Sequence, residues 1–141
     1  MISAILDTNV VVQAAISPRG ASHRTLGAYF DGKFQLVFSE ATLQELTQVL
    51  LLPSMQVRHG WSDSDVEDFV AFLAMDAAIY VGRPAVPANL TRDVTDAKFL
   101  SLAVESGADY LVTNDRRHLL RLRRHASTRI VSPMQFLNAL P

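Results

Sequence analysis

Short apolar runs alternate along the chain with stretches in which apolar residues recur every three or four positions. The recurrence is clearest at Val66, Phe69, Val70 and Leu73, whose i, i+3, i+4 and i+7 spacing is typical of the buried face of a helix. The apolar runs are short enough to be strands, and they occupy residues 2–6, 35–38, 79–81, 110–113 and 129–131. Strands separated by helices predict an α/β fold with a mostly parallel central sheet covered on both faces.

Capping residues indicate where the predicted helices begin and end. N-caps are expected at Ser39, Ser62 and Ser132, and Gly107 suits the C′ position of the helix that Asp96 begins. The predicted helices cover 22–30, 40–51, a segment from 63, a segment from 96 and a short segment from 133.

Three further segments follow less regular patterns. Residues 10–16 continue the apolar run of the first strand as far as a loop at 17–20. Two prolines make residues 82–89 an irregular loop, and the arginine-rich segment after 115 is predicted to be a helix.

Size and composition fit one enzyme domain with a sizeable core, covering residues 1–141, of which 49% are hydrophobic. The chain has no cysteine, which excludes disulfides, thiolate metal sites and redox chemistry through protein thiols. No basic leader precedes the first strand, and no apolar run approaches the roughly 20 residues that span a bilayer. We therefore expect a soluble, cytoplasmic protein that does not bind membranes.

Four carboxylates are placed for chemistry. Asp7 and Asp115 directly follow apolar strands, whereas Asp96 begins a helix and Glu45 lies within one. Strand ends and helix starts meet at one edge of an α/β sheet, so these acids can share a pocket. Two like charges about 4 Å apart repel by roughly 4 kcal/mol at an intermediate dielectric, and a divalent cation removes that repulsion. Ligands that are all oxygen favour Mg²⁺ or Mn²⁺ over zinc and suit phosphodiester chemistry.

Basic residues crowd into the segment after Asp115, although the net charge of the chain is only −1. A phosphodiester needs a positive approach to an acidic site, so this segment is a candidate RNA-binding surface as well as an ordinary solvated helix face. The residues assigned to RNA binding are Arg116, Arg117, Arg121 and Arg124. The polar neighbours assigned to orienting the acids or a water are Thr8, Asn9, Thr113 and Asn114.

Two histidines and two further acids are given lesser roles. His118 and His125 are seven residues apart, and we interpret both as surface residues because a metal-activated water makes histidine unnecessary. Glu40 competes with Glu45, but a glutamate in the first helical turn is explained by the helix dipole. Asp93 is a weaker candidate than the third acid chosen above.

Four blocks of sequence occur at specific separations. They are Leu-Asp-Thr-Asn at 6–9, Ser39 with Glu45-Leu46 and Val49-Leu50, Asp96-Ala-Lys-Phe-Leu through Ala103, and Tyr110-Leu-Val-Thr-Asn-Asp115. Together they cover nearly the whole chain, and in this order they resemble the PIN-domain family. The resemblance is to its bacterial branch of VapC-like ribonucleases, the toxin components of toxin-antitoxin pairs.

The resemblance implies a Rossmann-like three-layer α/β/α sandwich and a Mg²⁺- or Mn²⁺-dependent endoribonuclease. It implies that Asp7, Asp96 and Asp115 bind the metal and that Glu45 completes the catalytic set, Asp115 matching the least uniform of the four acids. The branch often carries an extra acid where this chain has Ala97. The resemblance also implies a homodimer, for which the apolar helices after Ser39 and Ser62 are available, and a neighbouring antitoxin. An antitoxin arginine in the pocket would neutralise the same carboxylates.

The expected substrate is single-stranded RNA, because a metal pocket at a sheet edge reaches an unpaired strand more easily than a duplex interior. In-line attack by metal-activated water predicts 5′-phosphate and 3′-hydroxyl products. The arginines would hold the RNA backbone with little preference for sequence.

Three alternatives remain open on the sequence. A catalytically weak or inactive PIN-like domain would bind RNA or a partner, but the full set of acids argues against it. A phosphotransfer enzyme of the haloacid dehalogenase type also has Asp after the first strand, but Asn9 replaces the second acid of its Asp-x-Asp. A two-component receiver domain needs an acceptor Asp after a central strand, where Phe38 instead leads into Ser39.

Overall fold

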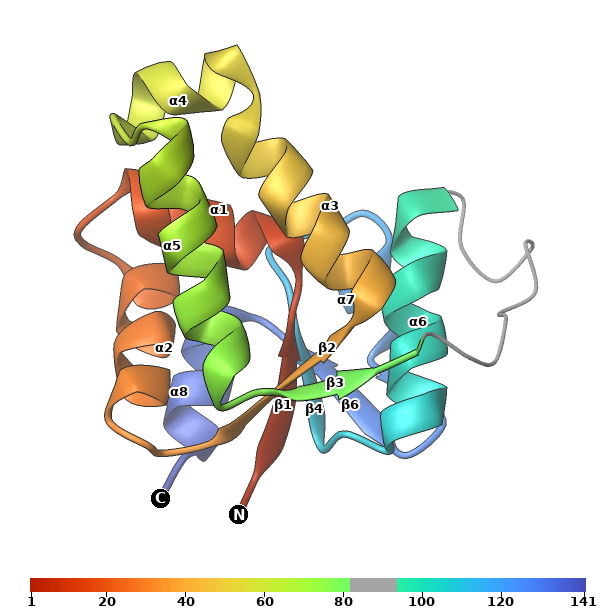
Figure 1. The fold of residues 1–141 in the computed structure, drawn as a ribbon. Helices are drawn as coiled ribbons and strands as arrows, with labels where there is room; N and C mark the ends of the chain where they lie inside the picture. Colours follow the sequence, from red (N-terminus) through yellow and green to blue (C-terminus); the bar gives the residue numbers. More distant parts are fainter. Residues whose placement is uncertain (82–93) are drawn as a thin grey trace.

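A six-stranded sheet forms the centre of the fold (Figure 1). The computed structural model describes residues 1–81 and 94–141. The strands are β1 (Ser3–Leu6), β2 (Gln35–Ser39), β3 (Ala78–Tyr80), β4 (Tyr110–Val112), β5 (Arg124–His125) and β6 (Thr128–Val131). Their order is β3-β2-β1-β4-β6-β5, and every neighbouring pair is parallel except β5 with β6. The predicted α/β fold with a mostly parallel sheet is confirmed.

Helices cover both faces of this sheet (Figure 1). They are α1 (Thr8–Ile16), α2 (Ala21–Phe30), α3 (Glu40–Leu51), α4 (Pro53–His59), α5 (Asp63–Met75), α6 (Val94–Ser106), α7 (Leu119–Leu122) and α8 (Pro133–Ala139). Helices α1, α2, α3, α5 and α8 share one buried cluster, and α6 and α7 share another. Successive side chains of β1 point to opposite faces of the sheet, so Leu6 packs in the first cluster and Ile5 in the second. No helix in the described residues is long and apolar enough to cross a bilayer.

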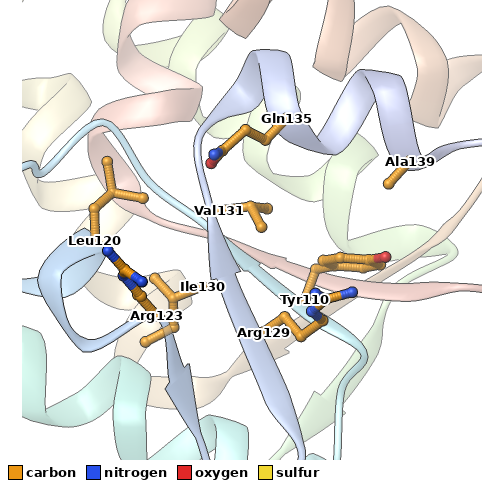
Figure 2. A pocket seen from close by; sticks show the side chains of 8 residues that line it. All are labelled: Tyr110, Leu120, Arg123, Arg129, Ile130, Val131, Gln135 and Ala139. Carbon is orange, nitrogen blue, oxygen red and sulfur yellow. The ribbon is translucent and has the colours of Figure 1, made fainter.

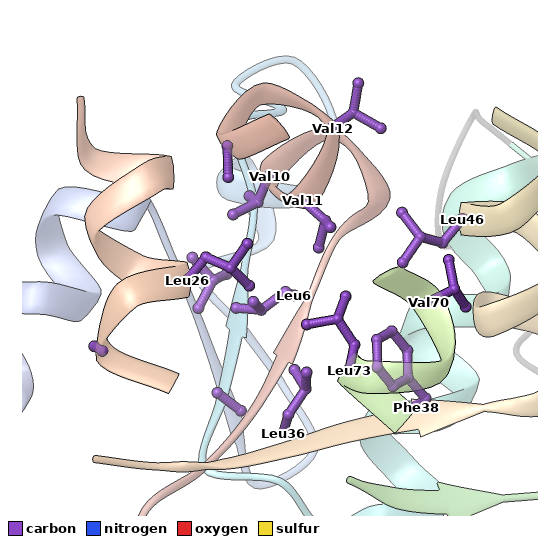
Figure 3. Close-up of a cluster of buried hydrophobic side chains, with 14 of the residues drawn as sticks. Leu6, Val10, Val11, Val12, Leu26, Leu36, Phe38, Leu46, Val70 and Leu73 are labelled. Carbon is purple, nitrogen blue, oxygen red and sulfur yellow. The ribbon is translucent and has the colours of Figure 1, made fainter. Parts of the chain in front are cut away.

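The larger cluster anchors the helix that follows the first strand. Figure 3 shows Leu6 of β1 close to Leu26 of α2 and below Val10 and Val11 of α1, and Leu36 of β2 belongs to the same cluster. Each of these side chains is at most 6% exposed, and burying one fully contributes about 1.5–3 kcal/mol. Strand β1 and helix α1 are therefore held rigidly on either side of the single residue that joins them.

The predicted caps are present. The side chains of Ser39, Ser62 and Ser132 each accept a hydrogen bond from the backbone N–H three residues later, at 3.1–3.2 Å. Gly107 follows α6 with a φ of +62°, as expected for a C′ glycine. Local signals therefore placed the starts of α3, α5 and α8 and the end of α6 correctly.

Two helices differ from the sequence prediction. Residues 10–16, predicted only as a continuing apolar run, belong to α1 (Thr8–Ile16), and Val10, Val11, Val12 and Ala14 are all buried in it. Because this helix is buried on most of its sides, its sequence lacks the polar face by which an amphipathic helix is recognised. Helix α4 was not predicted; it begins at Pro53, which has the fixed φ of a first helical residue.

The prediction of an arginine-rich helix after residue 115 is wrong. Only the four residues of α7 are helical, and the chain then forms an antiparallel hairpin in which Arg124 pairs with Arg129 and His125 with Thr128. The two-residue turn places Ala126 at a φ of +52°. His118 and His125 therefore do not lie on one helix. The predicted loop at 82–89 and Asp93 lie outside the described residues.

Candidate active site

One open pocket collects all four predicted acids at the carboxyl-terminal edge of the parallel strands. Its volume is about 660 Å³. The lining residues are Asp7, Thr8, Asn9, Val12, Glu45, Val49, Met55, Asp96, Phe99, Asp115 and His118. They come from the ends of β1 and β4, from α1, α3, α4 and α6, and from the turn before α7. The sheet topology thus brings together acids up to 108 positions apart in sequence.

Asp7 is the most deeply placed of these acids. It is the N-cap residue of α1 and is 5% exposed. The pKa of Asp7 is raised to about 6, chiefly by burial and to a smaller extent by the charges of Glu45 and Asp115, against the lowering effect of hydrogen bonds from Thr113 and the backbone of Thr8. Oγ1 of Thr113 donates its hydrogen bond to Oδ2 of Asp7 at 2.7 Å. Burial disfavours the charged form of this carboxyl group, and a bound cation would stabilise that form. A raised pKa of this kind is common at functional sites.

Asp96 and Asp115 lie in the same pocket beside His118. Asp96 is 6% exposed and stands in the first turn of α6. His118 Nδ1 lies 3.4 Å from Asp115 Oδ2 and 4.0 Å from Asp96 Oδ2. One ligand atom from each of the three residues lies within 4.8 Å of the others.

The charged form of Asp115 is favoured by its surroundings. Burial alone would raise its pKa, but the backbone N–H of His118, a side-chain hydrogen bond with Asp96 and the backbone N–H of Arg117 bring the pKa below its ordinary value. The carboxylate oxygens of Asp96 and Asp115 lie together with the imidazole nitrogen of His118, and carboxylate oxygens are the usual ligands of hard divalent cations. The donor set therefore fits a divalent metal ion.

Glu45 is held by contacts at both of its carboxylate oxygens. Oγ1 of Thr8 donates to Oε2 at 2.5 Å, and Nζ of Lys98 donates to Oε1 at 3.0 Å in a half-buried ion pair. The lysine offsets one of the four negative charges around the pocket. Glu45 is thus fixed at the pocket wall by a hydroxyl and an ammonium group, whereas Glu40 is exposed and lines no part of the pocket.

The polar residues predicted beside the acids all make contacts at this edge. Besides binding Asp7, Thr113 Oγ1 accepts from the backbone N–H of Asp115 at 3.0 Å, so one hydroxyl joins two acids. The side chain of Asn9 accepts from the backbone N–H of Asn114 at 3.2 Å and ties the ends of β1 and β4 together. Asn114 also donates to Ser22 Oγ at 3.2 Å and so contacts α2 rather than the acids.

Sequence reasoning missed His118, Lys98 and the apolar wall. His118 was interpreted as a surface residue, but it lines the pocket because the chain turns sharply after Asp115; the only sequence signal was its three-residue spacing from that acid. Lys98 stands two residues after Asp96 and reaches Glu45 across the α3–α6 contact. Met55 was missed because it belongs to α4, which was not predicted.

The four arginines assigned to RNA binding are exposed, and none forms an ion pair with another described residue. They lie in the turn before α7, in α7 and in β5, so they do not form one helix face. Two other arginines of this segment line a separate cavity of about 590 Å³. Figure 2 shows Arg123 beside Leu120 and Ile130 on one side of β6, and Arg129 beside Tyr110 on the other. Among the described residues no acid lines this second cavity, so it lacks the carboxylates that gather in the first pocket.

Replacing Thr113 by valine is expected to destabilise the protein by about 1–3 kcal/mol, because the substitution leaves the buried Asp7 carboxyl and the Asp115 N–H without their shared partner. Urea unfolding measures this free energy. Thr25→Val is the matched control, since Thr25 is equally buried but only bonds back to Ala21 in its own helix. Equal stability losses in the two variants would contradict the bridging role of Thr113.

Comparison with known proteins assigns the family. The PIN domain model matches residues 3–117, a stretch that contains all four acids. The chain is also 30% identical over 122 residues to the uncharacterized protein MJ1680 of Methanocaldococcus jannaschii, covering 86% of this chain and 76% of that protein. The name of this relative states no activity. The family match, the parallel α/β sheet and the acidic pocket agree, and the chain belongs to the PIN-domain family.

Proposed function

We propose that this protein is a divalent-metal-dependent endoribonuclease that hydrolyses single-stranded RNA. The observation that carries the proposal is the convergence of Asp7, Glu45, Asp96 and Asp115 on one open pocket. PIN domains are generally nucleases and typically use divalent metals, which supports the same reaction class. Membership in this family also displaces the phosphotransfer and receiver alternatives.

Asp7, Asp96 and Asp115 would hold Mg²⁺ or Mn²⁺ in this proposal. When bound, the ion supplies a more acidic water and stabilises negative charge on the phosphoryl oxygens. Thr113 fixes the orientation of Asp7, and the backbone N–H groups of Arg117 and His118 fix that of Asp115 at 3.1 Å each. These bonds keep the carboxylates in place before substrate arrives, which is the general requirement for electrostatic preorganisation.

Glu45 orients the attacking water in this scheme. Its carboxylate faces the pocket and cannot rotate freely, because Thr8 and Lys98 hold one oxygen each. Attack in line with the departing 3′ oxygen breaks the bond between phosphorus and that oxygen. The products then carry a 5′-phosphate and a 3′-hydroxyl.

A single strand is the substrate that best matches the open pocket and its apolar wall. Val49 and Met55 are partly exposed where they line the pocket, and they can contact unpaired bases. The exposed arginines next to Asp115 would contact the phosphates. Positioning of this kind gives affinity without sequence preference.

Incubation of the protein with RNA and Mg²⁺, Mn²⁺ or EDTA tests the activity. We expect cleavage of single-stranded RNA with either metal, little cleavage of the matching duplex, and none in EDTA. A folded protein that binds the RNA but never cuts it would favour the binding-only alternative. Cleavage that persists in EDTA would contradict the metal dependence.

Replacing Arg116, Arg117, Arg121 and Arg124 by alanine together is expected to raise KM for RNA and leave kcat nearly unchanged. For each arginine that binds a phosphate in wild type, the slope of log affinity against log salt should become shallower by about 0.7 on a single strand. Salt titrations of RNA binding measure the slope. The control removes two exposed arginines elsewhere, Arg19 and Arg58. An equal slope in the two variants would show that the arginine-rich segment does not bind the RNA phosphates.

We further propose that the nuclease is the toxin of a toxin-antitoxin pair and acts as a homodimer in the cytoplasm. The support is the sequence resemblance to the VapC-like branch of the family now assigned. Induced expression should arrest growth, whereas expression of the Asp96→Asn variant should not. Growth arrest by both proteins would show that toxicity does not depend on RNA cleavage.

The homodimer is tested by sedimentation of the purified protein. Sedimentation that gives only monomer would contradict it.

A further inference from the structure

We propose that His118 is a metal ligand, so that the site binds a first-row transition ion such as Mn²⁺ in preference to Mg²⁺. The inference rests on the proposed metal-dependent function and adds a nitrogen donor to its carboxylate set. It assigns to this chain a mixed nitrogen and oxygen site formed by Asp96, Asp115 and His118.

The geometry of the three side chains supports a shared ion. Nδ1 of His118 lies 3.4 Å from one carboxylate oxygen of Asp115 and 4.0 Å from one of Asp96. These atoms come from separate elements, since Asp96 lies on α6 and the other two lie in the turn before α7. One cation placed between them could contact all three, and all three residues line the pocket that contains Asp7.

The backbone holds His118 in this position. Its N–H donates to Asp115 Oδ1 at 3.1 Å, and the N–H of Leu120 donates to the backbone carbonyl of Asp115 at 3.0 Å. The turn therefore directs the imidazole back over the acid three residues earlier. Leu119, which is fully buried against α6, anchors the other side of the turn. An imidazole placed by packed backbone needs little reorganisation to meet an ion.

An imidazole facing two carboxylates has two possible roles. It can carry a proton and form an ion pair with them, or it can give its nitrogen lone pair to a cation. The position of His118 beside both acids serves either role, but only the second changes which metal binds. Carboxylate sites suit Mg²⁺ and Mn²⁺ alike, whereas imidazole adds affinity for transition ions and almost none for Mg²⁺.

The binding of Mn²⁺ and Mg²⁺ to purified wild type, His118→Ala and His23→Ala, measured by calorimetry without RNA, tests the inference. His23 is an exposed histidine outside the pocket and serves as the control. We expect His118→Ala to weaken Mn²⁺ binding by about ten-fold or more, the loss typical of removing a group that supports a metal site. Its Mg²⁺ affinity should stay near that of wild type. Equal weakening for both ions, or no weakening, would overturn the inference.

Pulsed electron paramagnetic resonance of Mn²⁺ bound to wild type gives a second readout that does not depend on the variant folding. We expect a nitrogen-14 coupling from a directly bound imidazole in wild type and His23→Ala, and its absence in His118→Ala. Mn²⁺ binding without nitrogen coupling, together with active RNA cleavage, would overturn only the role of His118. Failure of wild type to bind either ion would overturn this inference and the proposed metal-dependent function together.

Discussion

Asp7→Asn and Asp96→Asn are each expected to slow RNA cleavage by at least about a thousand-fold, because in the proposed mechanism each removes a charge that would hold the ion and with it several kcal/mol of transition-state stabilisation. Both residues line the pocket and are nearly buried, at 5% and 6% exposed. Asparagine keeps the size of aspartate and lacks its charge. Single-turnover cleavage of a labelled RNA measures the effect.

Asp68→Asn is the matched control for these two variants. Asp68 is an exposed acid on α5 that lines none of the pockets described above, so its loss should leave the cleavage rate near that of wild type. Circular dichroism and urea unfolding establish that each variant is folded. Folded Asp7→Asn or Asp96→Asn protein with the wild-type rate would show that the acidic pocket is not the catalytic site.

Asp7→Asn is also expected to stabilise the metal-free protein at pH 8, by up to about 3 kcal/mol, while it abolishes activity. The reason is the pKa of Asp7, which burial raises from 3.8 to about 6. The folded state therefore holds a proton that the unfolded state releases near pH 4. The resulting stability is fully present below about pH 4 and is lost as the pH rises through about 6.

The difference in unfolding free energy between wild type and Asp7→Asn isolates this effect from other titrating groups. In EDTA, the difference should shift against wild type as the pH rises from 4 to 7. Saturating Mn²⁺ at pH 8 should reverse it, because a ligand that binds only the folded wild type stabilises it. A difference that is constant with pH, or that favours wild type at pH 8 in EDTA, would contradict a raised pKa at Asp7.

The parts of the site that could be predicted are those fixed by strand ends. Asp7 and Asp115 follow β1 and β4, and parallel neighbouring strands must end at one edge, so local apolar runs were enough to bring these acids together. Predicting that Asp96 and Glu45 join them also required the motif spacing of the family, since a residue on a helix can face in several directions. The same signals also gave the N-caps and most of the order of the elements.

The parts that could not be predicted depend on packing or on unusual turns. Lys98 meets Glu45 only because α6 packs against α3. The hairpin of β5 and β6 has no glycine or asparagine in its turn, and Ala126 takes the positive φ instead, so the basic segment resembled a helix. That misinterpretation placed His118 on a solvated face and concealed its contact with the two acids.

The chemical ends of the RNA products test the central claim most directly. Wild-type protein with Mn²⁺ and a single-stranded RNA should give fragments with a 5′-phosphate and a 3′-hydroxyl, identified by mass spectrometry, and no fragments in EDTA. These ends require attack by water at a site of the proposed kind. Fragments that end in a 2′,3′-cyclic phosphate would show attack by the 2′-hydroxyl of the RNA itself, and they would contradict the mechanism proposed for this pocket.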